Sequence, residues 1–279
     1  MYWPAWLDGI PINNPKKDKI MFFLNHKMKK LFILLVIGII SSLQTLSWSV
    51  EPDKDLVLYL PMEKDLLDAS GNKNDGELAN GKVSLQKGKF GKAIELAADQ
   101  PIVIEPSDSL HGDIFLEPFT YTLWINPDFK GTEWGHLWRS LPGASGHNTL
   151  FLNSAQGLLS FRGVVGGWSV LCQTDGGLVK KNTWYQVTLT SDTKKFRIYL
   201  NGKLEKEDDY QDTKGKIAEF RIGGSANETY SGLMDDVAFY KRALDKDEIK
   251  SITNSGMDAF LSVASKGKLT LNWATIKTE

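Results

Sequence analysis

Alternating apolar and polar positions recur along the chain and predict β-strands. In the segment 119–126, FTYTLWIN, the Phe, Tyr, Leu and Ile side chains share one face. The segment 184–192, WYQVTLTSD, alternates in the same way. In 195–206, KFRIYLNGKLEK, an alternating run enters Asn201-Gly202, a dipeptide suited to the positive φ angles of a tight hairpin turn. Further strands are predicted for IAEFRIGG (217–224), GLMDDVAFYKR (232–242) and several shorter runs, among them TLFLN, GLLSFRG and SVLCQT.

One short helix is predicted near the C-terminus, after the last strand. Asp245 is suited to cap it, Glu248 three residues later completes a capping box, and Ile249 and Ile252 form an apolar pair. About a dozen strands in one unbroken series indicate an all-β sandwich or barrel. We expect a single domain over residues 50–256, followed by a tail at 257–279. In that tail, LTLNWATI is expected as a further edge strand or a packed flap.

The first 49 residues are not expected to belong to the domain. Residues 1–27 have no periodic pattern and contain three prolines, so they are expected to be untranslated or disordered. Residues 28–49 have the three parts of a secretory signal: a basic start, the apolar run LFILLVIGII and a region of small residues. The apolar run is shorter than the roughly 20 residues that span a bilayer. The protein is therefore expected to be secreted, periplasmic or cell-surface, and membrane-bound only if the signal stays uncleaved.

Charge and cysteine content exclude some classes of protein. Without residues 1–49, the chain holds 27 Lys and Arg and 32 Asp and Glu, a net charge of −5. This balance argues against a nucleic-acid partner, which attracts a basic surface. Cys172 is the only cysteine, so no internal disulfide is possible, and its strand-like surroundings suggest a small buried apolar residue. Nothing in the sequence indicates an oligomeric state.

The segment 68–81, DASGNKNDGELANG, is rich in side-chain oxygen, which leaves two interpretations open. Ca²⁺ takes six to eight oxygen ligands, and Asp68, Asn72 and Asn74 offer carboxylate and amide oxygens. Alternatively, these are turn residues that close Asx-turns by themselves. A metal would need a distant partner as well. Asp235 and Asp236 are adjacent on a predicted strand, so their side chains are expected to point to opposite faces.

Four segments, in this order, resemble the laminin-G-like jelly rolls of the concanavalin-A-like lectin/glucanase superfamily. They are DASGNKNDGELANG with GKFGKAIEL (88–96), the strand 119–126 with its "T-x-x-x-W-I" pattern, the Trp-led segment 184–203, and GLMDDVAFYKRAL (232–244) before the helix start. The likeness covers residues 55–255. It implies a two-sheet antiparallel jelly-roll sandwich that binds carbohydrate or protein, often beside calcium. It also implies that Asp235 is the metal-side aspartate. We therefore predict a structural Ca²⁺ held by Asp68, Asn72, Asn74 and Asp235.

Aromatic residues in predicted loops are candidates for ligand binding. Sugars present apolar C–H faces between hydroxyl groups, and Trp joins an apolar body to a polar handle. A long loop predicted at 127–148 concentrates such residues, and the glycines of GVVGGWS (163–169) are expected to expose another. Trp124 and Trp184 lie in predicted strands and are expected in the core. The predicted ligand-binding residues are Trp134, His136, Trp138, Arg139 and Trp168.

No catalytic motif is recognisable in the predicted domain. Glycosidases need two carboxylates about 5–10 Å apart, and the E-x-D-x-x-E pattern of the laminarinase-like members is absent. The acidic run 205–209 is expected to be solvated. The sequence therefore predicts a non-catalytic binding module for a glycan or an extracellular protein. Two alternatives stay open: a glycoside hydrolase with an unrecognised carboxylate pair, and a structural or adhesive cell-envelope protein.

Overall fold

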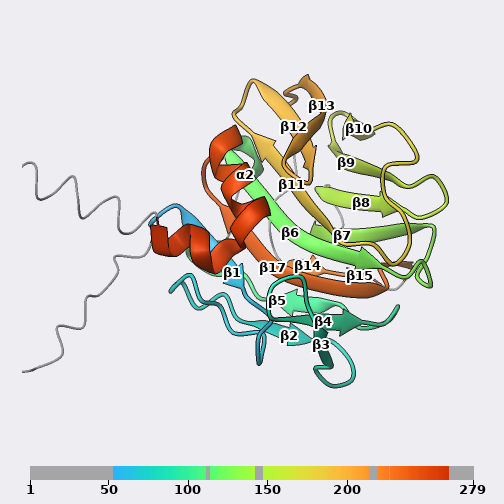
Figure 1. The fold of residues 1–279 in the computed structure, drawn as a ribbon. Helices are drawn as coiled ribbons and strands as arrows, with labels where there is room; N and C mark the ends of the chain where they lie inside the picture. The colour runs from blue at the N-terminus through green and yellow to red at the C-terminus, as the bar shows by residue number, and fades with distance from the viewer. Residues whose placement is uncertain (1–52, 111–113, 142–146, 214–218, 226, 264–279) are drawn as a thin grey trace, which may run out of the picture. The chain divides into compact units, whose positions relative to one another are not determined.

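The computed structural model describes one unit of the chain, which begins at Glu51. The described residues are 53–110, 114–141, 147–213, 219–225 and 227–263 (Figure 1). The predicted leader segments 1–27 and 28–49 and the predicted edge strand LTLNWATI lie outside them. Within these ranges, no helix has the length and apolar character needed to cross a membrane.

Two antiparallel sheets form the fold, as the sequence predicts for a jelly-roll sandwich (Figure 1). The first has eight strands, in the order β13 (Lys203–Asp209), β12 (Lys195–Leu200), β11 (Tyr185–Ser191), β6 (Phe119–Pro127), β17 (Gly232–Tyr240), β4 (Lys92–Leu96) and β3 (Leu85–Lys87), with β1 (Leu56–Leu60) also paired to β17. The second has seven, in the order β10 (Trp168–Gln173), β9 (Leu158–Val164), β8 (Thr149–Asn153), β7 (Trp134–Leu141), β14 (Glu219–Ile222), β5 (Ile102–Ile104) and β2 (Gly76–Leu78). A small third sheet pairs β15 (Gly224–Ser225) with β16 (Glu228–Thr229).

The main core lies between the two large sheets. In β6, Phe119, Tyr121, Leu123 and Ile125 are fully buried, as the alternation predicts. Strands β11 and β17 flank β6 in antiparallel register, so each apolar side chain of β6 meets neighbours on both sides. Cys172 is also fully buried in this core, where burial raises the pKa of its thiol.

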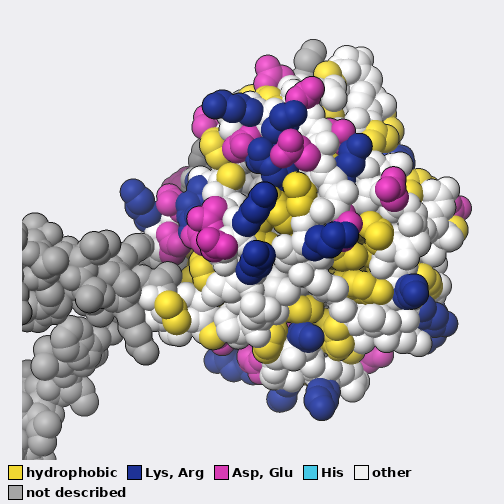
Figure 2. All heavy atoms as spheres, turned by 45° about the horizontal axis from the view of Figure 1, so that its top comes forward, with side chains coloured by type: hydrophobic (Ala, Val, Ile, Leu, Met, Phe, Trp, Pro, Cys, Tyr) yellow, Lys and Arg dark blue, Asp and Glu magenta, His cyan; other side chains and the backbone are white. Residues whose placement is uncertain are grey.

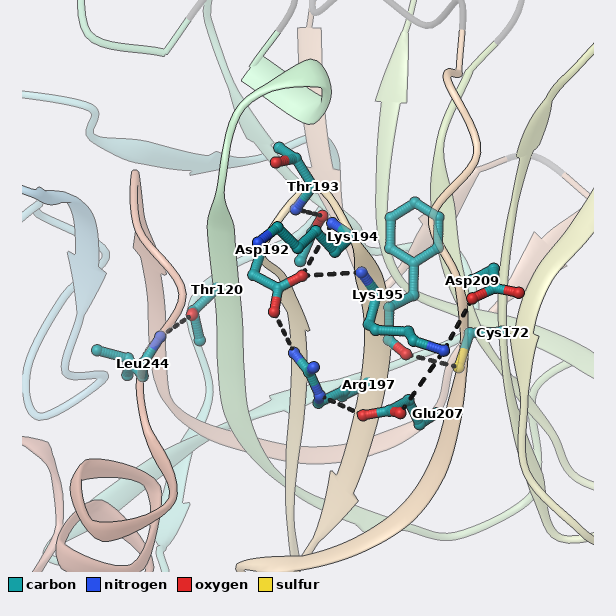
Figure 3. Close-up of polar contacts among 12 residues, drawn as sticks. Thr120, Cys172, Asp192, Thr193, Lys194, Lys195, Arg197, Glu207, Asp209 and Leu244 are labelled. Atoms are coloured by element: carbon teal, nitrogen blue, oxygen red, sulfur yellow. Dashed lines mark hydrogen bonds and ion pairs between the residues drawn. The ribbon is translucent and has the colours of Figure 1, made fainter.

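The predicted hairpin is confirmed, and it forms a charged edge of the eight-stranded sheet. Asn201 and Gly202 take φ angles of 51° and 75°, so β12 turns directly into β13. The acidic run 205–209 lies within β13 itself, so it is a strand. Its carboxylates pair with cations on β12: Arg197 Nε lies 2.6 Å from Glu207 Oε2, and Lys195 Nζ lies 2.8 Å from Asp209 Oδ1 (Figure 3). Such charges protect an exposed edge from pairing with another chain.

A helical layer covers the outer face of the eight-stranded sheet (Figure 1). The helix α2 (Lys246–Ser255) begins with the predicted capping box, in which Asp245 Oδ1 accepts hydrogen bonds from the backbone N–H groups of Asp247 and Glu248. Residues 257–263 are also helical, so two short helices follow the last strand where the sequence predicts one. Both helices contribute to a second apolar cluster against β1 and β17. Acidic and basic side chains are intermingled over this side of the molecule (Figure 2).

A bulge in β17 changes the direction of one aspartate. The register shifts between Asp235 and Ala238, and Asp236 has a φ of 50°. Both carboxylates therefore lie on the outer side of the sheet: Asp235 accepts from the backbone of the β3–β4 turn, and Asp236 accepts from Met257 N at 3.1 Å. The prediction that these neighbours point to opposite faces is wrong, because the extra residue of the bulge breaks the strand alternation.

Candidate binding site

Three neighbouring strands of the seven-stranded sheet, β7, β8 and β9, bring aromatic and basic side chains together on its outer face. The register places His136 opposite Phe151, and it aligns Arg139, Thr149 and Arg162 across the three strands. Their neighbours along β8 and β9, among them Leu150, Leu152 and Phe161, belong to the core. Because successive strand residues point to opposite faces, Phe151 and Arg162 face outward.

The long loop predicted at 127–148 is in large part strand β7, and a bulge in that strand removes Trp138 from the site. The register shifts between His136 and Trp138. Trp138 is fully buried and stacks between Phe115, at 5.0 Å between ring centroids, and Phe220, at 5.4 Å. The prediction that Trp138 contacts ligand is therefore wrong, because its indole fills the core instead.

Trp134 lies under a guanidinium group. The Arg162 Cζ atom is 4.0 Å from the centroid of the Trp134 ring and 5.7 Å from that of Phe151. Arg162 Nε donates to Ser160 Oγ at 3.0 Å, which fixes the orientation of the guanidinium plane. A cation over an aromatic face is attracted by the ring quadrupole. This contact holds both Trp134 and Arg162 in place on the outer face.

Trp168, at the start of the edge strand β10, is the exposed aromatic residue of this group. Its side chain is 46% exposed, and the ring of His147 lies 4.4 Å away between centroids. Phe151 meets it edge-on at 6.5 Å. The preceding Gly166 and Gly167 leave open space, since a Cβ at either position would meet nothing within 4 Å. The predicted exposure of Trp168 by these glycines agrees with the structure.

The two histidines of this group are neutral at neutral pH. Burial, together with the charge of Arg139, lowers the pKa of His136 to about 3 and that of His147 to about 4. His136 Nε2 lies 3.1 Å from Glu228 Oε2. Burial lowers the pKa values of Arg139 and Arg162, and the nearby Glu228 carboxylate acts in the opposite direction and raises them. The charge here is therefore carried by guanidinium and carboxylate groups.

Four of the five predicted ligand residues, Trp134, His136, Arg139 and Trp168, lie in this one group, and their role in binding stays a prediction. Sequence reasoning missed Phe151, Arg162 and Glu228. The alternation of TLFLN and GLLSFRG places Phe151 and Arg162 on one face of their strands. It does not say which strands are neighbours, so the group emerges only from the register.

The predicted metal ligand Asp68 accepts hydrogen bonds from its own loop and from β1. Asp68 Oδ1 accepts from Tyr59 N and Ser70 N, both at 2.9 Å, and Oδ2 accepts from Ser70 Oγ at 2.8 Å and Asn74 N at 2.9 Å. Four hydrogen bonds to one carboxylate satisfy it without a cation. This arrangement matches the turn interpretation of the segment 68–81.

The two asparagines of the same loop donate to the first strand. Asn72 Nδ2 donates to Leu56 O at 2.9 Å, and Asn74 Nδ2 donates to Val57 O at 2.7 Å. Asn74 Oδ1 accepts from Ser107 Oγ. The loop therefore donates hydrogen bonds to two backbone carbonyls of β1.

Asp235 belongs to a different network from Asp68. Asp235 Oδ2 accepts from Lys89 N at 2.9 Å and Phe90 N at 3.1 Å, in the β3–β4 turn. Its other oxygen, Oδ1, is buried and has no partner in the described part of the chain. Burial, and then the nearby charge of Asp236, raises the pKa of Asp235 to about 7.

The four predicted calcium ligands fall into two separate hydrogen-bond networks. Asp68, Asn72 and Asn74 are bonded around β1, while Asp235 is bonded to the β3–β4 turn. Among the described residues, no group of three or more His, Cys, Asp and Glu side chains is arranged to hold a metal. Calcium binding stays a prediction, and each predicted ligand has a structural role without it.

The four strands that carry this group supply no carboxylate of their own. The strands β7, β8, β9 and β10, all of whose residues are described, contain no Asp or Glu. Glu228 reaches the group from β16. Glycoside hydrolysis requires two carboxylates in the roles of acid and of base or nucleophile, and the non-catalytic role of this protein stays a prediction.

The fold is shared with several binding domains of known structure. Domain 4 of AbnA, an extracellular GH43 arabinanase from Geobacillus stearothermophilus, was solved with arabinotriose. It is 17% identical with a TM-score of 0.61, over 72% of this chain and 98% of that domain. The binding domain of Paraclostridial Mosquitocidal Protein 1 is 23% identical with a TM-score of 0.58, over 72% and 52%. The binding domain of botulinum neurotoxin DC, solved with rat synaptotagmin II, is 17% identical with a TM-score of 0.54, over 73% and 52%.

The chain thus spans about half the length of the two toxin domains, and at these identities the likeness shows the fold alone. No curated protein sequence matches the chain. A sequence model described as the concanavalin A-like lectin/glucanases superfamily matches residues 100–250, which is more than half of the chain. The chain therefore belongs to the concanavalin A-like lectin/glucanase superfamily.

Proposed function

We propose that this protein is an exported, non-catalytic binding module that takes a carbohydrate on the outer face of its seven-stranded sheet. The signal predicted at 28–49 supports export to the periplasm, the cell surface or the medium. Structures of the same fold were solved with arabinotriose and with a protein receptor, which supports a binding role. The calcium ion forms no part of the proposal.

The observation that carries the proposal is the exposed indole of Trp168 beside fixed polar groups. Large aromatic side chains are mostly buried in soluble proteins, whereas the Trp168 side chain is 46% exposed. Phe151 and His147 hold the Trp168 ring from two sides. The ring therefore offers a platform for the C–H face of a sugar, with Arg162 on the neighbouring strand as a hydrogen-bond donor.

Binding to a panel of soluble oligosaccharides, measured by isothermal titration calorimetry, tests this proposal. Trp168→Ala is expected to weaken the best ligand by roughly 5- to 100-fold, since a buried aromatic contact contributes about 1–3 kcal/mol. Trp184→Ala is the matched control. Trp184 is partly buried just before β11, in the other sheet, and its loss is expected to leave affinity unchanged.

Other outcomes would favour the other classes of function. Release of reducing ends from a bound polysaccharide would identify a hydrolase and contradict a pure binding role. Binding to an extracellular protein that survives Trp168→Ala, without any binding to saccharides, would favour an adhesive role. Thermal melting of each variant shows whether a lost affinity reflects a lost fold.

A further inference from the structure

The chemistry of the ligand follows from the arginine that lies over Trp134. The Arg162 guanidinium is held by Trp134 on one side and by Ser160 Oγ at its Nε. Within the described residues, no carboxylate lies within 4 Å of it, and no acceptor takes its two terminal amino groups. A guanidinium with a fixed plane and open terminal N–H groups is arranged to bind a planar or branched anion in two-point fashion.

The surroundings of Arg162 favour an anion as well. The strands β7, β8, β9 and β10 carry Arg139 and Arg162 but no acidic residue. Glu228, reaching over from β16, is the carboxylate whose charge acts on Arg162, and it lies 3.1 Å from His136 Nε2. Burial lowers the pKa values of both arginines, so each charge is partly stripped of water. A partly desolvated cation is stabilised when an opposite charge binds next to it.

Trp168 indicates that the anion belongs to a saccharide. Phe151 is the neighbour of both groups, with its ring 6.5 Å from that of Trp168 and 5.7 Å from Arg162 Cζ. The exposed indole and the guanidinium therefore both lie next to the same phenyl ring. A ligand of more than one sugar unit could stack on Trp168 while an acidic substituent reaches Arg162.

We propose that this face selects anionic oligosaccharides, with Arg162 binding the carboxylate or sulfate group and Trp168 stacking on a sugar ring. This inference rests on the proposed carbohydrate-binding function and names its ligand class. Arg162 acts as a specificity-determining residue: it distinguishes an acidic sugar from the neutral sugar of the same shape. Neutral oligosaccharides lose the charged contact and keep the stacking contact.

The test uses matched ligands and matched variants of the full chain. Three probes are titrated by calorimetry at low and at physiological salt: an oligogalacturonate, the same oligosaccharide with its carboxylates methyl-esterified, and a sulfated galactan oligosaccharide. The wild type is expected to bind at least one acidic probe about 10-fold or more tighter than the ester. The carboxylate and sulfate arms show which anion is preferred.

Arg162→Gln is expected to reduce affinity for the acidic probe by roughly 10- to 100-fold and to leave affinity for the ester unchanged. Arg162→Lys keeps the charge but loses the planar fork, so only partial affinity is expected. Arg197→Gln is the control, because it removes an equal charge from β12, where Asp192 and Glu207 hold the guanidinium (Figure 3). Its affinity is expected to match the wild type.

The outcomes separate this inference from the function on which it rests. If neither acidic probe binds more tightly than the ester, the inference is overturned and carbohydrate binding is left standing. Equal losses in Arg162→Gln and Arg197→Gln overturn the role of Arg162, since they indicate a general charge effect. Absence of binding to all three probes and to the wider panel overturns both proposals. Melting temperatures show that the Gln variants are folded.

Discussion

Replacing Trp138 tests whether the bulge in β7 assigns this tryptophan to the core and not to the binding face. The Trp138 side chain is fully buried, with ring centroids 5.0 Å from Phe115, 5.4 Å from Phe220 and 5.5 Å from Tyr121. Truncating a buried Trp to Ala costs about 3–5 kcal/mol, from lost transfer energy and the cavity left behind. For a domain of this size, each kcal/mol lowers the melting temperature by about 2–4 °C.

Trp138→Ala is therefore expected to lower the melting temperature by about 6–20 °C, measured by circular dichroism. Trp168→Ala is the paired variant, because it removes the same side chain from the outer face, and its melting temperature is expected to change little. Ligand affinity should fall more in Trp168→Ala than in Trp138→Ala, measured at a temperature where both variants are folded. An unchanged melting temperature in Trp138→Ala, together with lost binding, would refute the assignment of Trp138 to the core.

Three further changes probe the polar networks. Asp235→Asn should stabilise the fold by up to about 4 kcal/mol at pH 8 and not at pH 4. The Asp235 carboxyl has a pKa near 7 in the folded chain and near 4 in the unfolded chain, so its ionisation destabilises the folded chain as the pH rises between those values. Urea unfolding in EDTA at both pH values measures this effect, and a stability difference that does not depend on pH would contradict it. Asp68→Ala should lower the free energy of unfolding by roughly 2–3 kcal/mol, equally in calcium and in EDTA, because the four hydrogen bonds that Asp68 accepts come from the chain itself. If calcium raises the melting temperature of the wild type and the variant abolishes that rise, the predicted metal site is restored. Asp245→Ala should cost about 1 kcal/mol through loss of the helix cap, and Asp245→Asn, which keeps the acceptor, should cost less; equal losses would argue against the cap.

The features that the sequence predicts well are set by residues close together in the chain. The alternation in 119–126 places the core side chains of β6, Asn201-Gly202 makes the hairpin turn, and Asp245 with Glu248 caps the helix. Each depends on local backbone preference, which tertiary contacts here reinforce. For this reason the fold class and several element boundaries follow from the sequence.

The errors arise at the two bulges. One extra residue in β7 turns Trp138 inward and returns Arg139 to the outer face, and one in β17 brings Asp236 to the same side as Asp235. A bulge depends on how a strand pairs with its neighbours, and that pairing is not written in the strand's own alternation. The expected ligand contact of Trp138 comes from its place in a predicted loop, and the expected divergence of Asp235 and Asp236 comes from strand alternation. The structure places Trp138 in the core and both aspartates on one side of the sheet.

The composition of the candidate site was only partly predictable for a related reason. Arg162 and Phe151 come from strands that sequence reasoning located, yet their meeting with Trp134 depends on the order of strands in the sheet. Glu228 reaches the same face from a two-residue strand that has no periodic signal. Such long-range neighbours are fixed by the packing of the whole sandwich.

The helices over β1 and β17 have a consequence for valency. Among the described residues, they pack on the outer side of the eight-stranded sheet, so the proposed binding face, on the other sheet, gives each copy of the chain one place at which to hold a polymer. Tight retention on a polysaccharide would then come from repeated epitopes along the polymer or from several copies of the chain bound at once. Both raise the effective concentration of binding sites, and neither needs two binding faces on one molecule.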